Sequence, residues 1–323
     1  MKKVVATTRR EDFDKIHALL EGTLHSLERE DDLIRITVYV HDNELDGLVD
    51  VLEKTIDMRY KKSMIEVYTP DFIISSFLER SKEKAEESEE KPVIEELIDS
   101  TRPHLTLDVS EIAMVTIAGM IALTGLFMNS VAIIIGAMLL SPLLGPIHAF
   151  TINTAVGKVR DVLKCILNLG VMLLMVIGFS FLTTSVITQY GELSLTPEIL
   201  ARMDSSFIYI LMALLLGFAS IFALSRNISE SVAGVAIAAA LLPPAAVTGI
   251  SLVLYPSRAV NSLVLTLENV FGLMAGGLCA TFLLDIRPRR YYERAVARKV
   301  IFRTAVVLVI LLGLLCVTSF YCN

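Results

Sequence analysis

The sequence predicts an α-helical polytopic membrane protein with a small α/β domain at its N-terminus. The chain is 54% hydrophobic and its mean hydropathy is +0.63, which exceeds what a soluble domain normally tolerates. Charge is unevenly distributed, because residues 1–109 hold 26 of the 35 acidic residues. From Glu111 onward the apolar runs are long enough to cross a bilayer core, which requires about 20 helical residues. We therefore expect a soluble acidic part followed by a membrane part.

Residues 1–78 carry the hydrophobic patterns of a small cytoplasmic α/β domain. The segments "KKVVATT", "LIRITVYV" and "SMIEVY" are expected strands, and the second alternates apolar and polar side chains as a half-buried strand does. Between the first two, Thr8 and Glu11 fit the capping box of a helix. The expected apolar face of this helix consists of Phe13, Ile16, Leu20, Leu24 and Leu27. With a second helix from Asn43, the order is βαβαβ, a ferredoxin-like arrangement.

Residues 79–109 are expected to form a charged helical linker between the two parts. The stretch "ERSKEKAEESEEKPVIEELIDS" is dense in charge, lacks a sustained apolar face and is interrupted at Pro92. This pattern is typical of a solvated helix.

The membrane part, residues 110–323, is expected to cross the bilayer seven times. The apolar runs cover roughly residues 110–128, 130–156, 162–187, 206–225, 231–254, 261–284 and 301–320. No signal peptide is recognisable, so we expect the N-terminus in the cytosol. With that orientation the cytoplasmic loops hold eleven basic residues and the external loops hold only Arg202 and Arg258, which fits the positive-inside rule. The C-terminus is then external to the cell membrane.

An apolar phrase occurs twice, 101 positions apart. "SVAIIIGAMLLSP" begins at Ser130 and "SVAGVAIAAALLP" begins at Ser231. Each lies on the second of three crossings, in residues 110–187 and 206–284, and the run 301–320 is left as an extra helix. Because three is odd, the second group enters the membrane inverted relative to the first, as in many transporters. The alternative is chance similarity, since six identities in thirteen can arise in a stretch rich in Ala, Ile and Leu.

The prolines of both copies predict where a substrate site lies. Proline removes a helical N–H and clashes with the preceding turn, so each copy is expected to interrupt its helix. Freed carbonyl groups inside a membrane are tolerated where they line a cavity or are buried in protein. The expected site residues are Ser141, Pro142, Gly145, Pro146, Pro243, Pro244 and Thr248. The alternative is that these prolines only kink the helices and that the glycines allow close packing.

Three polar residues inside the spans are expected to line the same site. Glu268 lies within the sixth span, where an ionised carboxylate costs at least about 2.5 kcal/mol, and Asn269 adjoins it. The 101-residue offset pairs Asn269 with Asn168. A packing hydrogen bond or an interfacial glutamate is the alternative for Glu268. His148 and Glu111 are expected to be solvated near the membrane interface.

The cytoplasmic domain is a weaker candidate for binding a nucleotide or another phosphate-containing ligand. Loops that lead from strands into helix N-termini present N–H groups to anions, and here they read "TTRRE" and "HDNE". The residues concerned are Thr7, Thr8, Arg9, Arg10, His41 and Asn43. No glycine-rich phosphate loop is present, so a plain folding domain with solvated arginines is the alternative. The four cysteines have no metal-binding spacing, and neither a metal nor a nucleic-acid partner is expected.

Three longer phrases resemble a known family. "IAGMIALTGLFMNSVAIIIGAMLLSPLLGPI", "LTPEILAR" and "VAGVAIAAALLPPAAVTGI" are similar to the motifs of the integral membrane proteins grouped as domain of unknown function 389. The resemblance covers about residues 105–284 and implies membrane insertion, but it supplies no function.

Two functions therefore stay open. The first is a homo-oligomeric transporter or channel for an ion or small solute, regulated by its cytoplasmic domain. The second is a membrane-anchored oligomeric nucleotide or anion sensor, or a scaffold, without transport activity. An enzyme is not expected, because the spans contain no HExxH or GxSxG motif.

Overall fold

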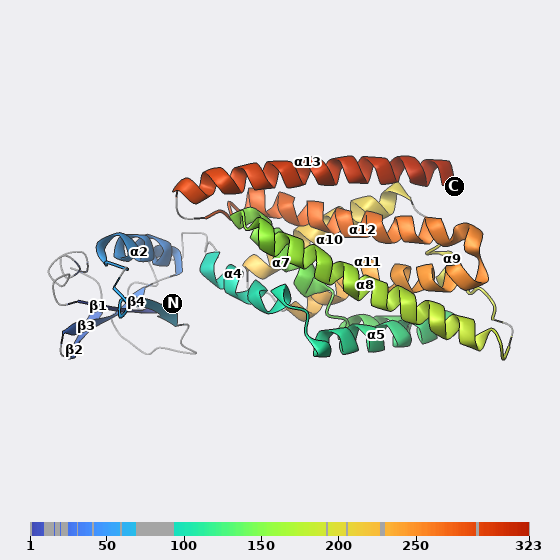
Figure 1. The fold of residues 1–323 in the computed structure, drawn as a ribbon, viewed down its shortest axis with the longest axis horizontal. Coiled ribbons are helices and arrows are strands. Elements are labelled where there is room, and N and C mark those ends of the chain that lie inside the picture. The colour runs from blue at the N-terminus through green and yellow to red at the C-terminus, as the bar shows by residue number, and fades with distance from the viewer. Residues whose placement is uncertain are drawn as a thin grey trace, which may run out of the picture. The chain divides into compact units, whose positions relative to one another are not determined.

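The chain divides into two compact units, Met1–Val93 and Ile94–Asn323. The computed structural model describes residues 2–9, 16, 20, 25–30, 32–40, 42–58, 60–68, 94–191, 193–204, 206–226, 230–288 and 291–322 (Figure 1). Each unit is considered by itself. Of the expected linker, residues 79–93 lie outside the described residues, and the rest belongs to the second unit.

The first unit contains a four-stranded antiparallel sheet with the order β2-β3-β1-β4. Its described elements are β1 (Lys2–Arg9), β2 (His25–Glu30), β3 (Leu33–Val40), α2 (Asp42–Thr55) and β4 (Met64–Tyr68). This strand order is that of a ferredoxin-like sheet. The buried residues Ile34, Ile36 and Val38 of β3 confirm the alternation predicted from the sequence, and they pack with Leu45 and Leu52 of α2.

Strand β2 corrects the sequence prediction. Leu27 was expected on the apolar face of a helix, but it lies in β2, pairs with Ile36 and is exposed. All described side chains of β2 except that of His25 are exposed, so side-chain burial does not hold this strand. Instead, β2 is held by backbone hydrogen bonds to the edge of β3. The spacing of apolar residues along the sequence does not reveal this pairing.

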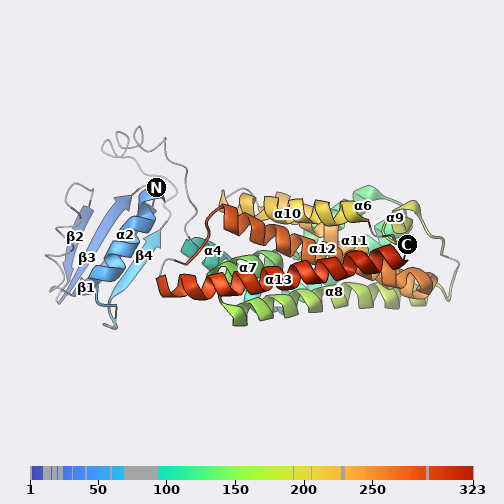
Figure 2. The ribbon, with the colours of Figure 1, turned by 90° about the horizontal axis from the view of Figure 1, so that it is seen from above.

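The second unit is a bundle of helices. Its elements are α4 (Ile94–Thr101), η2 (Arg102–Leu105), α5 (Val109–Phe127), α6 (Val131–Leu140), α7 (Leu144–Val156), α8 (Val159–Ile187), α9 (Pro197–Leu200), α10 (Phe207–Ser225), α11 (Glu230–Leu254), α12 (Pro256–Leu283) and α13 (Tyr291–Cys322). Among the described residues six helices are long and apolar enough to span a membrane, and the pair α6–α7, bent by 51°, makes a seventh if it is one span (Figure 2). These helices fit a membrane protein.

The centre of the bundle is formed by α11 and α12, whose apolar windows are each 72% buried. Helix α11 contacts α5, α6, α8, α10 and α12, while α12 contacts α7, α10 and α13. Helix α13 is peripheral, because only 11% of its apolar window is buried within the chain. Most described polar residues of α11 and α12 are therefore buried, whereas most of the surface of α13 is not covered by the rest of the chain.

The predicted interruption at the first proline pair is present. Helix α6 ends at Leu140, and Ser141, the residue before a proline, has an extended backbone with φ −81° and ψ 121°. Pro142 and Pro146 are four residues apart, so the two missing N–H groups fall on the same side of the helix in successive turns. The chain resumes as α7 at Leu144.

The predicted interruption at the second proline pair is wrong. Helix α11 runs without a break through Pro243 and Pro244. In a regular helix the N–H of residue 244 would donate to the carbonyl oxygen of Ala240. Pro244 has no such group, and Asn269 Nδ2 of α12 donates to this oxygen instead, at 2.7 Å. A neighbouring helix thus supplies the hydrogen bond that the proline removes.

Candidate functional site

A cavity of about 320 Å³ lies at the break between α6 and α7. Three parts of the chain line it: the end of α4 with η2, the break with its flanking turns, and the first half of α11. The lining residues are Ser100, Thr101, His104, Met138, Leu139, Ser141, Pro142, Leu144, Gly145, His148, Gly234 and Val235. Three of the predicted site residues, Ser141, Pro142 and Gly145, are therefore brought together here.

His104 is held against the break by three contacts. Its imidazole lies over Gly145, where an added Cβ would come within 2.2 Å of Nδ1, so only glycine leaves room for the ring. The same Nδ1 lies 3.2 Å from Glu111 Oε1, a contact that becomes an ion pair when the imidazole is protonated. Asn168 Nδ2 of α8 donates to the backbone carbonyl of His104 at 3.0 Å. The predicted residues Gly145 and Asn168 thus act on the cavity through one histidine.

Two buried polar groups of the cavity have no hydrogen-bond partner among the described residues, Ser141 Oγ and His148 Nε2. The residues are 8% and 5% exposed, respectively. By contrast, the hydroxyls of Ser100 and Thr101 each donate to a carbonyl of their own helix. Buried polar groups in folded proteins are nearly always paired, so these two groups at the cavity wall are exceptional.

The histidines also correct the sequence predictions. His148 was expected to be solvated at the membrane interface, but it is buried in α7. Glu111 is partly buried and pairs with His104 rather than with water alone. His148 follows Gly145 by three residues, which places both on one face of a helix, and this spacing was the signal available in the sequence. Nothing in the sequence indicated that His104 reaches this face.

Comparison with known proteins finds relatives of uncharacterised function. The family described as "Domain of unknown function (DUF389)" matches residues 138–275. An uncharacterised protein of Methanocaldococcus jannaschii is 31% identical over 221 residues, which are 66% of this chain and 68% of that relative. This chain belongs to the DUF389 family. No solved structure matches it. The matched region of this DUF389 protein begins at Met138, just before the break, and includes Ser141 and His148.

The other predicted residues of the DUF389 region lie outside the cavity. Pro146 is buried in the first turn of α7, and Pro243 and Pro244 are enclosed within α11. Thr248 Oγ1 donates to the carbonyl of Pro244 at 2.9 Å. The Thr266 Oγ1 of α12 lies 3.4 Å from Thr248 Oγ1. The structure therefore separates the predicted residues into a cavity at the α6–α7 break and a packed polar contact between α11 and α12.

Glu268 belongs to neither group. Its side chain in α12 is fully buried, and neither carboxylate oxygen has a hydrogen-bond partner among the described residues. It does not line the cavity. The structure does not bring Asn168, Asn269 and Glu268 together in the described cavity, because the two asparagines donate to backbone carbonyls of different segments. That the three residues line one substrate site stays a prediction.

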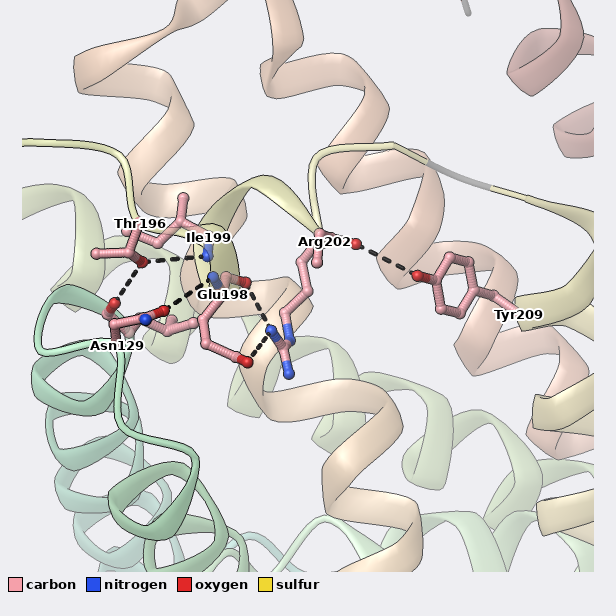
Figure 3. A network of polar contacts seen from close by, with 8 residues as sticks. Asn129, Thr196, Glu198, Ile199, Arg202 and Tyr209 are labelled. Atoms are coloured by element: carbon pink, nitrogen blue, oxygen red, sulfur yellow. Dashed lines mark hydrogen bonds and ion pairs between the residues drawn. The ribbon is translucent and has the colours of Figure 1, made fainter.

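At another part of the bundle, the "LTPEILAR" phrase forms α9 and ties two loops together (Figure 3). Thr196 Oγ1 donates to the carbonyl of Leu126 at 2.6 Å, and the N–H of Glu198 donates to Asn129 Oδ1 at 3.3 Å. Asn129 has a positive φ of 51°, which asparagine tolerates better than most residues. Arg202 pairs with Glu198 Oε2 at 2.6 Å, so its charge is compensated within the loop.

The residues predicted to bind phosphate in the first unit are only partly described. Thr7 and Thr8 lie within β1, paired with β3, and not in a loop. The Arg9 guanidinium lies 4.0 Å from the centroid of the Tyr60 ring, a cation–π contact. Arg10, His41 and the side chain of Asn43 lie outside the described residues. Nucleotide binding by this unit stays a prediction.

Proposed function

We propose that this protein moves a small ion or solute across a membrane through the cavity at the α6–α7 break. The observation that carries this proposal is a broken helix inside a membrane bundle whose break borders two buried, unpaired polar groups. Irregular backbone at membrane depth is tolerated where it lines a cavity or is buried in protein. Discontinuous helices also form the substrate sites of many secondary transporters.

The proposal includes seven crossings, with α5, α6–α7 and α8 forming one repeat and α10, α11 and α12 forming an inverted copy. In this arrangement α8 corresponds to α12, and the α6–α7 pair corresponds to α11. The packing supports it, because α8 contacts α11 and, equivalently, α12 contacts α7. The distribution of basic residues in the loops supports a cytoplasmic N-terminus and an external C-terminus. Homo-oligomerisation in the cell membrane remains part of the proposal.

Regulation by the first unit would pass through α4, which follows that unit directly in the chain. Leu97 of α4 belongs to an apolar cluster with Ile152 and Ala155 of α7. His104 follows within η2 and lies against Gly145. A conformational change in the first unit that displaces α4 would therefore also displace His104 at the wall of the cavity.

Flux measurements on the full chain in proteoliposomes test this function. We expect the wild type to move at least one member of a panel of small ions and neutral solutes, and Gly145→Val to abolish that flux by displacing His104. Gly136→Ala is the control, because an added Cβ at Gly136 meets nothing within 4 Å. If the wild type moves nothing in the panel, while nucleotides raise the melting temperature of the full chain, the sensor function replaces this proposal.

A further inference from the structure

We propose that the cavity at the α6–α7 break binds a small anion. This inference rests on the proposed function and names the class of its substrate. The lining contains no aspartate and no glutamate. The nearby carboxylate of Glu111 is engaged by His104 Nδ1. Cation sites for hard metals usually include carboxylate oxygens, and this lining offers none.

Two residues of the cavity wall carry unpaired polar groups that can donate hydrogen bonds. Ser141 Oγ carries an O–H without a described acceptor. His148 Nε2 also has no described partner, and it carries an N–H in one neutral tautomer and in the protonated imidazole. Both residues are more than nine-tenths buried and line the cavity.

The start of α7 adds backbone donors to the same wall. Leu144 and Gly145 are the first two residues of this 13-residue helix, and both line the cavity. The first N–H groups of a helix have no partner within it, and together with the helix dipole they favour negative charge. Pro146 follows and contributes no N–H.

At the opposite side of the break, one carbonyl of the α6 end is already engaged. Helix α6 ends here, and terminal carbonyls favour positive charge. However, the Met138 carbonyl already accepts the N–H of Ser141 at 3.2 Å. A volume of about 320 Å³ accommodates an anion of a few heavy atoms with part of its hydration shell. Nitrate, formate, acetate, chloride and hydrogen phosphate are suitable probes.

A matched pair of serine variants tests the anion site. Ser141→Ala removes the unpaired hydroxyl of the cavity wall, whereas Ser220→Ala removes a buried hydroxyl of α10 that does not line the cavity and donates to the carbonyl of Gly217 at 2.8 Å. Flux of the five anions, of Na⁺ and K⁺ and of urea is measured in proteoliposomes. We expect flux of at least one anion, a decrease of about three- to tenfold in Ser141→Ala and no decrease in Ser220→Ala.

A second pair of variants keeps the test decisive if Ser141→Ala folds poorly. His148→Gln retains an N–H donor and His148→Phe does not, so anion-induced thermal stabilisation at constant ionic strength should persist in the first and disappear in the second. Anion flux that neither Ser141→Ala nor His148→Phe lowers would overturn the site. Flux of K⁺, Na⁺ or urea alone, lowered by Ser141→Ala, would overturn the anion class and leave transport intact. The absence of any flux would overturn transport itself, whereas anion-induced stabilisation that depends on His148 would still support the site.

Discussion

Two helical segments of this protein contain prolines at positions 101 residues apart, yet one is broken and the other is not. The α6–α7 pair bends by 51° after Pro142, while α11 continues through Pro243 and Pro244. The contrast shows that a proline removes a hydrogen bond, but that the surrounding structure decides whether the helix breaks.

Two physical differences account for the contrast. In the first segment the prolines are four residues apart and remove N–H groups from one side of two successive turns. In α11 they are adjacent, and one of the two carbonyls that they leave free accepts Asn269 Nδ2. The corresponding Asn168 donates instead to His104 and so secures the wall of the cavity. Two halves of similar sequence have thus become a broken helix with a cavity and an intact helix that lines one side of it.

The largest expected effect on flux comes from Gly145→Val, which adds a side chain at the start of α7, beside the break. The added side chain would overlap the imidazole of His104, so His104 should leave the cavity and lose Glu111. We expect flux to fall by more than about tenfold and stability to fall by about 1–3 kcal/mol, the usual cost of overpacking. Proteoliposome flux and denaturation in detergent measure both. Normal flux in Gly145→Val would show that the His104 contact is irrelevant to transport.

The next prediction tests why α11 stays intact. Asn269→Leu leaves the Ala240 carbonyl buried and unpaired, which should destabilise the protein by about 1–3 kcal/mol. Pro244→Ala restores the N–H that donates to this carbonyl in a regular helix, so Asn269→Leu should cost less in that background. Coupling of about 1 kcal/mol or more in the double-mutant cycle is expected. Strict additivity would mean that Asn269 does not replace the missing bond.

A smaller effect is expected at Glu268, an ionisable residue whose counterpart in the first half is apolar. Its counterpart at the 101-residue offset is Leu167, which is 66% exposed on α8, whereas Glu268 is fully buried in α12. Burying an ionised carboxylate without a partner is costly, so we expect this group to carry a proton. Glu268→Gln should then change the free energy of unfolding by less than about 1 kcal/mol. The infrared difference spectrum between the wild type and Glu268→Gln checks the same point, because a protonated Glu268 contributes a carboxylic acid C=O band that the variant lacks; a carboxylate band in its place would contradict the expectation.

The smallest effect is expected at α9, which belongs to neither of the two proline-containing segments compared above and does not line the cavity. Arg202→Ala removes an (i, i+4) ion pair with Glu198 that is partly solvated, so the loss should be about 0.3–0.5 kcal/mol. Flux should remain unchanged. A large loss of flux in Arg202→Ala, measured beside the wild type, would show that this loop takes part in transport.

The sequence by itself determined the features that depend on local composition and periodicity. The apolar runs overlap α5, the α6–α7 pair, α8, α10, α11, α12 and α13, and the alternation in β3 matches its buried side chains. The break after Leu140 was predictable because its causes, Pro142 and Pro146, are local. Ser141 and Gly145 followed from the same phrase.

Only the tertiary structure decided the features that depend on contacts between distant segments. Asn269 donates to the α11 carbonyl that Pro244 leaves free, from 29 residues away, and Asn168 donates to His104 from 64 residues away. β2 forms because β3 offers an edge to pair with, and His148 is buried because α4 and α11 enclose the break. A hydrogen bond or a close packing contact requires both partners in place, and a pattern read along the chain specifies only one of them.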